Sequence, residues 1–162
     1  MRCLFKVLPL AGAAFCMPAP AAGTVNVTFE KPENFQDASR DYPRQTDQSV
    51  LDALAAYIKE QAAPLLDDDQ TLDITITEIN LAGEFRPYTA TQQMVRTLTE
   101  VTWPQMTLEY TLREGGEAGP VQKVQLADMN YRQRVRAPSD DEPLYYDKKM
   151  LDEWIRKTFG RR

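Results

Sequence analysis

The chain has 162 residues, a net charge of −5 and no histidine, and its two cysteines, Cys3 and Cys16, lie close to the N-terminus. An acidic chain is poorly suited to nucleic acid, because affinity for the phosphate backbone comes largely from Lys and Arg. The lack of histidine excludes serine–histidine catalysis, imidazole metal ligation and histidine-based pH switching.

Residues 1–22 have the three-part order of a secretory signal peptide. Arg2 and Lys6 precede an apolar run over residues 7–15, which small residues and prolines follow. Ala19-Pro20-Ala21 fits the A-x-A rule, so we expect cleavage within about two residues of position 22. The apolar run is too short to span a membrane, which takes about 20 residues. Acylation of Cys16 is disfavoured, because the bulky Phe15 precedes it. We therefore predict a soluble, exported, periplasmic protein.

Cleavage after residue 22 would remove both cysteines and leave 140 residues with a net charge of −7, because the leader holds two basic and no acidic residues. That chain would have no disulfide, no cysteine nucleophile and no thiolate metal site. Its length suits one domain over residues 23–162, stable on its apolar core. We predict no metal and no cofactor.

The first elements follow from hydrophobic periodicity. Thr24–Glu30 alternates apolar and polar residues, which predicts a strand. Lys31–Pro43 is polar and predicts a loop. Apolar residues at spacings of three and four then predict a helix from Asp47 to Ala63, which Pro64 ends. Ser49–Asp52 resembles a capping box and suggests where the helix starts.

The central strand covers residues 71–83. Leucine and isoleucine occupy every second position from 72 to 76, which predicts one buried face. The apolar phase then slips by one residue, to Ile79 and Leu81. A β-bulge near Thr77–Glu78 would return that pair to the buried face.

The remaining elements complete an α+β fold. Phe85–Tyr88 predicts a loop around Pro87, whereas Met94–Trp103 suits either a strand or a helix, its threonines favouring a strand. Residues 106–112 and 121–127 predict two strands of an antiparallel hairpin around a Gly-rich turn. A helix from residue 145 or 147 to Phe159 ends at Gly160. The order β-α-β-(β)-β-β-α predicts a mostly antiparallel sheet of four to five strands with both helices on one face.

Two acidic clusters are candidate ligand sites. Asp67-Asp68-Asp69 could attract Ca²⁺, but it lacks the spacing and the glycine of a calcium loop, so a solvated turn is favoured. Asp128 and Asn130 could share a face and hold a ligand. The alternative is a turn in which both side chains bind local backbone amides.

Arg132, Arg134 and Arg136 alternate with other residues. If this stretch is extended, the three guanidinium groups lie on one face about 7 Å apart. Such a stripe suits an anionic polymer or lipid headgroup. The alternative is an edge strand that its charges protect from aggregation.

Catalytic candidates are weaker. Tyr145, Tyr146 and Trp154 could stack against a sugar, but Trp154 lies on the apolar stripe of its helix and fits a core position. Glu78, Glu84 and Asp128 could supply a carboxylate pair of the glycosidase type, although no spacing marks them. We assign no catalytic residue.

Four short motifs resemble an uncharacterised exported bacterial family, catalogued as domain of unknown function 3016. They are Phe29-x-x-Pro32-Glu33-x-Phe35, Leu81-Ala82-Gly83, Asp128-Met129-Asn130-Tyr131 and Lys149-Met150-Leu151-Asp152-Glu153-Trp154. The resemblance implies export but carries no activity or ligand. The order of elements is also similar to small envelope modules, such as those in the amino-terminal part of the Tol translocation protein.

The sequence thus favours a non-catalytic module of the cell envelope that binds an envelope protein or an anionic polymer. The contact would be made by the sheet face opposite the helices or by the residue 132–136 strand. The alternative is a carboxylate-dependent hydrolase that acts on an envelope glycan. Two convergent carboxylates in a concave pocket would favour the hydrolase, and a flat or edge-strand surface the binding module.

Overall fold

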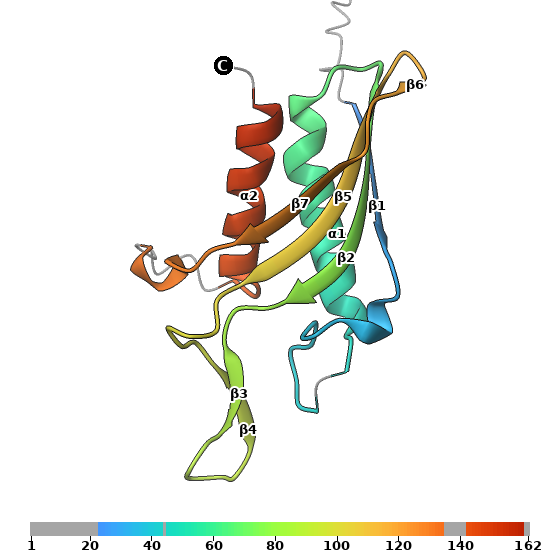
Figure 1. The fold of residues 1–162 in the computed structure, drawn as a ribbon. Coiled ribbons are helices and arrows are strands. Elements are labelled where there is room, and N and C mark those ends of the chain that lie inside the picture. The colour runs from blue at the N-terminus through green and yellow to red at the C-terminus, as the bar shows by residue number, and fades with distance from the viewer. Residues whose placement is uncertain (1–22, 44, 135–141, 161–162) are drawn as a thin grey trace, which may run out of the picture.

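The computed structural model describes residues 23–43, 45–134 and 142–160, and its central feature is a sheet covered on one face by two helices (Figure 1). β1 (Thr24–Phe29) runs parallel to β2 (Gln70–Asn80), and β2 runs antiparallel to β5 (Gln105–Glu114). β5 also pairs antiparallel with β6 (Glu117–Ala118) and with β7 (Gln122–Ala127). The predicted α+β fold is confirmed.

The two helices lie side by side against this sheet (Figure 1). α1 (Gln48–Ala62) begins at Asp47, whose Oδ1 accepts a hydrogen bond of 2.8 Å from the backbone N–H of Ser49. The capping box predicted at Ser49–Asp52 is therefore wrong, because the extended backbone of Asp47 lets its carboxylate cap the helix two residues earlier. Pro64 lies in the 3₁₀ turn η2 (Ala63–Leu65) that ends α1. α2 (Tyr145–Phe159) has the predicted bounds.

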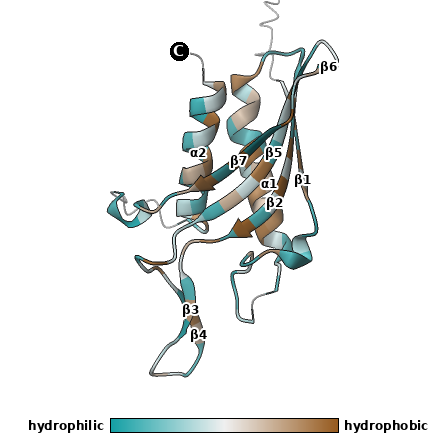
Figure 2. Ribbon diagram, in the orientation of Figure 1, coloured by the Kyte–Doolittle hydropathy of each residue, from teal (hydrophilic) through white to brown (hydrophobic). Residues whose placement is uncertain are grey.

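The core lies between the sheet and the helices. Apolar and polar residues alternate along β2 and β5, so that one sheet face is apolar (Figure 2). Burial of these side chains is the main favourable contribution to folding. The most completely buried side chains are Leu51, Leu54, Ile58, Leu72, Ile74, Ile76, Ile79, Leu81, Met106, Leu108, Tyr131 and Leu151.

The predicted bulge in β2 is confirmed. The register with β5 shifts between Ile76 and Glu78, so Thr77 is the extra residue. Ile79 and Leu81 are consequently buried, although they are out of phase with the residues before them. The bulge thus extends the core beyond the point where strict alternation would have ended it.

A second, two-stranded sheet projects from the body after β2 (Figure 1). β3 (Glu84–Pro87) pairs antiparallel with β4 (Met94–Thr97), and we call residues 83–104 the arm. The loop predicted at Phe85–Tyr88 is wrong. Pro87 is the last residue of β3, and its nitrogen faces away from β4, so its missing N–H costs no hydrogen bond between the two strands. Of the ambiguous segment Met94–Trp103, only the first four residues form a strand.

Candidate binding surface at one end of the molecule

Arg96 of β4 fastens the arm to the body. Its Nη1 donates to the carbonyl oxygens of Ala82 and Gly83, both at 3.3 Å. Its Nη2 donates to Oδ1 of Asp37 at 2.7 Å and to the carbonyl oxygen of Ser39 at 2.6 Å. The guanidinium also lies 4.5 Å from the ring centroid of Phe85. One side chain therefore joins both strands of the arm to the loop before α1.

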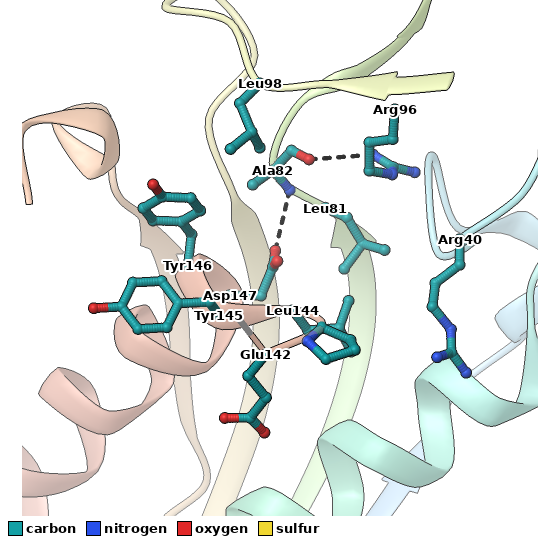
Figure 3. Close-up of a pocket in the computed structure, with 11 residues that line it drawn as sticks. Arg40, Leu81, Ala82, Arg96, Leu98, Glu142, Leu144, Tyr145, Tyr146 and Asp147 are labelled. Carbon is teal, nitrogen blue, oxygen red and sulfur yellow. Dashed lines mark hydrogen bonds between the residues drawn. The ribbon is translucent and has the colours of Figure 1, made fainter. Parts of the chain in front are cut away.

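Asp147, in the first turn of α2, provides a second attachment. Its Oδ1 accepts a hydrogen bond of 3.1 Å from the backbone N–H of Ala82, at the base of the arm (Figure 3). The carboxyl is fully buried, and desolvation raises its pKa to about 7, although the Ala82 hydrogen bond and Arg96 act in the opposite direction. Asp147 is thus a buried group that titrates near neutrality.

A cavity of about 290 Å³ lies between the arm and the start of α2. Leucines and tyrosines form much of its wall, with Arg40 and Arg96 on one side. Two carboxyl groups line it, but they point apart: Asp147 faces Ala82, whereas Glu142 points away from it (Figure 3). Glu142 instead contacts Nζ of Lys148. The cavity therefore does not present a convergent carboxylate pair.

The exposed apolar side chains of the described residues gather at this same end of the molecule. Large hydrophobic residues are exposed at seven described positions, and all but Val121 lie in the arm, in the loop before α1 or in the loop after β7. These three segments lie at one end of the sheet (Figure 1). We call this surface the apolar end; it consists of Tyr42, Tyr88, Val95, Leu98, Val101 and Met129.

The apolar end is supported from beneath by packed side chains. The ring of Tyr42 meets that of Phe85 edge-to-face, with centroids 5.9 Å apart. The hydroxyl of the fully buried Tyr131 donates to the carbonyl oxygen of Thr99 at 2.6 Å, which fixes the later part of the arm. Burial raises the pKa of Tyr131, so this hydroxyl keeps its proton.

The arginine segment is not extended where the structure describes it. Tyr131–Gln133 forms the 3₁₀ turn η3, because the buried Tyr131 draws the chain inward. Arg132 lies 3.4 Å from Oε1 of Glu100, while Arg134 bridges Asp128 at 2.7 Å and Glu153 at 2.5 Å. The premise of a one-faced arginine stripe therefore fails for Arg132 and Arg134. Arg136 lies outside the described residues, and anion binding by this segment stays a prediction.

The acidic clusters form local structure. Oδ1 of Asp128 accepts from the backbone N–H of Asn130 at 3.2 Å, the turn geometry that was the alternative to a ligand site. Its Oδ2 holds Arg134, so both of its oxygens have protein partners. The backbone of Asp67 accepts from Gln70 in the turn that leads into β2. Ligand binding by Asp128 and Asn130 stays a prediction.

Trp154 occupies a core position, as its helical stripe suggests. Its ring packs edge-to-face against Tyr110 and Phe159, with centroids 5.5 and 5.7 Å away. Its side chain is largely buried, although it lines part of the groove between β7 and α2, so it fits a core position rather than an exposed platform for sugar stacking. Tyr145 and Tyr146 instead contact one another edge-to-face beside the cavity at the start of α2.

Sequence patterns did not identify Arg96 or Asp147. Arg96 lies in a segment with both strand and helix periodicity, and Asp147 reads as an ordinary acidic residue in a first helical turn. The one local signal in the sequence was Gly83, a glycine directly after the apolar pair Leu81-Ala82. In the structure Gly83 has a φ of +84° and marks the point where the chain leaves the main sheet.

Together these features define a small α+β protein whose candidate contact surface is a hairpin arm held by buried polar groups. No helix in the described residues is long and apolar enough to cross a membrane. The chain belongs to the family described as "Protein of unknown function (DUF3016)", whose model matches residues 23–157. The resemblance seen in the sequence motifs is thereby confirmed. Comparison with curated proteins found no match, and neither did comparison with solved structures.

Proposed function

We propose that this protein is a non-catalytic binding module of the bacterial cell envelope and that the apolar end contacts a protein partner. The observation that carries the proposal is the distribution of exposed large apolar side chains: six of the seven found in the described part of the chain lie at one end. Clustered exposed apolar residues mark interaction sites on soluble proteins more often than scattered ones do.

The composition of the apolar end supports a protein partner. Tyr42 and Tyr88 bring large rings with few rotatable bonds, and tyrosine is enriched at protein–protein contacts. Arg86 lies two residues before Tyr88 in the arm and Arg132 three residues after Met129 in the loop after β7, and both side chains are exposed enough to form a polar rim. The surface therefore combines apolar anchors with charged neighbours.

The attachment of the arm also supports a binding role. Arg96 and Asp147 hold its base through buried hydrogen bonds, so the exposed side chains keep their places before a partner arrives. A preorganised surface loses less conformational entropy on binding than a mobile one.

Export rests on the predicted signal over residues 1–22, which lie outside the described part of the chain. The family match begins at residue 23, next to the predicted cleavage point, and supports the domain boundary there. The protein would then act in the periplasm.

The cavity argues against the alternative of a glycan hydrolase. Such enzymes place two carboxyl groups about 5–10 Å apart on either side of the scissile bond. Asp147 is instead directed at a backbone amide, and Glu142 points away from it (Figure 3). The geometry therefore favours binding over hydrolysis.

Site-specific photocrosslinking in cells of the native host tests the proposal. A photoreactive residue replaces Tyr88 or Val101 in the apolar end, and Val121 at the far end of the sheet serves as the matched control, being as exposed as Tyr88 or more. We expect one shared adduct from Tyr88 and Val101, recovered with the periplasmic fraction, and none of it from Val121.

The same adduct at all three positions, or no adduct at either arm position, would refute the assignment of the surface. Release of soluble sugar fragments from purified peptidoglycan by the wild-type protein, lost in Asp147→Asn, would support the hydrolase instead.

A further inference from the structure

β7 forms an open edge of the main sheet. Among the described strands it pairs with β5 alone, so its outer row of backbone groups faces no other described strand. Proteins usually protect such edges with charges, prolines or bulges. The one charged residue of β7 is Lys123, whose Nζ lies 3.3 Å from Glu109 on β5. The edge is therefore suited to pairing with an added strand.

A groove of about 540 Å³ runs beside this edge, between β7 and α2. Its apolar lining comes from Tyr110, Val124, Leu126, Met150 and Trp154. A strand added to β7 would direct every second side chain to the helix side of the sheet, over this groove. The groove therefore suits a strand with apolar residues at alternate positions.

β7 itself meets that requirement, because Val124 and Leu126 point to the helix side, next to the groove they line. We propose that β7 of one molecule pairs antiparallel with β7 of a second copy, so that the two sheets join across a twofold axis. With Gln125 on the axis, Val124 lies opposite the second copy's Leu126. Lys123 then faces the second copy's Ala127, and no like charges oppose one another along the strand.

Charges on α2 fit the same arrangement. Glu153 and Asp128 both bind Arg134, so Glu153 lies near the end of β7. Phe159 packs on Tyr110, which pairs with Gln122, so the last turn of α2 lies near the start of β7. Lys157 is in that turn and has no ion pair among the described residues.

In the first copy Glu153 lies near the end of β7 and Lys157 near its start. A twofold axis through the middle of β7 places these two residues at the opposite ends in the second copy. Each Glu153 is thereby brought across from the second copy's Lys157, which makes two equivalent ion pairs. A surface that complements itself in this way is what an isologous dimer requires. The inference concerns the β7 edge and is independent of the apolar end.

Sedimentation velocity of the full chain, from about 1 to 500 μM, tests the proposal, because an interface of one short strand and one groove predicts a micromolar dimer. Lys157→Glu would place two acidic side chains opposite one another and should weaken dimerisation about tenfold or more. The matched control is Lys59→Glu, which changes the same charge in the last turn of α1, away from β7. It should leave dimerisation unchanged.

Hydrogen exchange adds a second measurement that does not depend on a variant. We expect amides in residues 122–127 to gain protection as protein concentration rises, whereas the opposite edge, β1, does not. A monomer at every concentration would overturn the proposal. So would equal weakening by both charge reversals, or concentration-dependent protection at β1 rather than β7.

Discussion

The two ends of the sheet carry hairpins that are held in different ways. At one end the arm leaves the sheet altogether, and polar side chains that are largely or fully buried hold it: Arg96 is 18% exposed and its partner Asp37 only 2%. At the other end the β5–β6 turn continues strands of the main sheet, and the nearby pair of Arg113 and Asp73 is 49% and 33% exposed. A hairpin outside the sheet cannot rely on the main ladder, so it needs particular side chains to hold it.

The largest effect should come from removing the attachment of the arm. Arg96→Ala takes the guanidinium away from a buried carboxylate and from three carbonyl groups, which should lower the free energy of unfolding by about 3–5 kcal/mol. The equivalent change at the other end, Arg113→Ala, should cost less than about 1 kcal/mol, because an exposed ion pair contributes little. Chemical denaturation of both variants measures the difference. Equal losses would contradict the comparison.

The second effect concerns pH. The pKa of Asp147 is about 7 in the folded protein, above its ordinary value in the unfolded chain, so the folded state binds this proton more tightly. Its contribution to stability is therefore complete below about pH 4 and is lost as pH rises through 7, a change of about 4 kcal/mol. Asp147→Asn stays neutral and its amide oxygen can still accept from Ala82, so this slope should disappear.

Asp73, at the other end of the sheet, should change stability with pH in the opposite direction to Asp147. Hydrogen bonds from Asn26 and from Arg113 lower the pKa of its carboxyl, so its contribution is present near neutrality and is lost as the solution is acidified. Asp73→Asn should thus lower stability near neutral pH, and its difference from the wild type should disappear as the pH falls below about 4. Denaturation curves from pH 3 to 9 separate the two groups, and an unchanged slope in Asp147→Asn would show that another group titrates.

The smallest effect compares two glycines with positive φ. A Cβ at Gly83 would lie 2.6 Å from the carbonyl oxygen of Thr97 in β4, whereas a Cβ at Gly116 in the β5–β6 turn would meet nothing within 4 Å. Gly83→Ala should therefore cost about 2 kcal/mol or more, and Gly116→Ala about 1 kcal/mol from backbone strain alone. Thermal unfolding of both variants checks the order, and a larger loss at Gly116 would contradict it.

The difference between the main sheet and the arm also shows which parts of the fold could be predicted from the sequence. Strands and helices that bury one face were predictable, including the bulge at Thr77, because burial imposes a period that a single slip reveals. In the arm, threonines favoured a strand in Met94–Trp103, of which the first four residues form one. Neither β3 nor its pairing with β4 was predictable, because strands that are short and half-exposed carry little period. Arg96 acts through contacts with residues 37 and 39, nearly 60 positions away, and no local pattern encodes such a contact. The burial of Tyr131 was also not predictable from a local pattern. Because Tyr131 is buried, residues 131–133 form a 3₁₀ turn instead of the extended segment that the alternating arginines suggested.

The parallel pairing of β1 with β2 has a consequence for how the chain is made. Thr28 and Thr75 face one another across 47 positions, so the first strand to leave the ribosome cannot acquire its ladder until residue 80 or so has been synthesised. Until then Val25, Val27 and Phe29 have no sheet to cover them, and such contacts between distant positions form slowly. β1 is thus a segment that a holding chaperone would cover until β2 has been made.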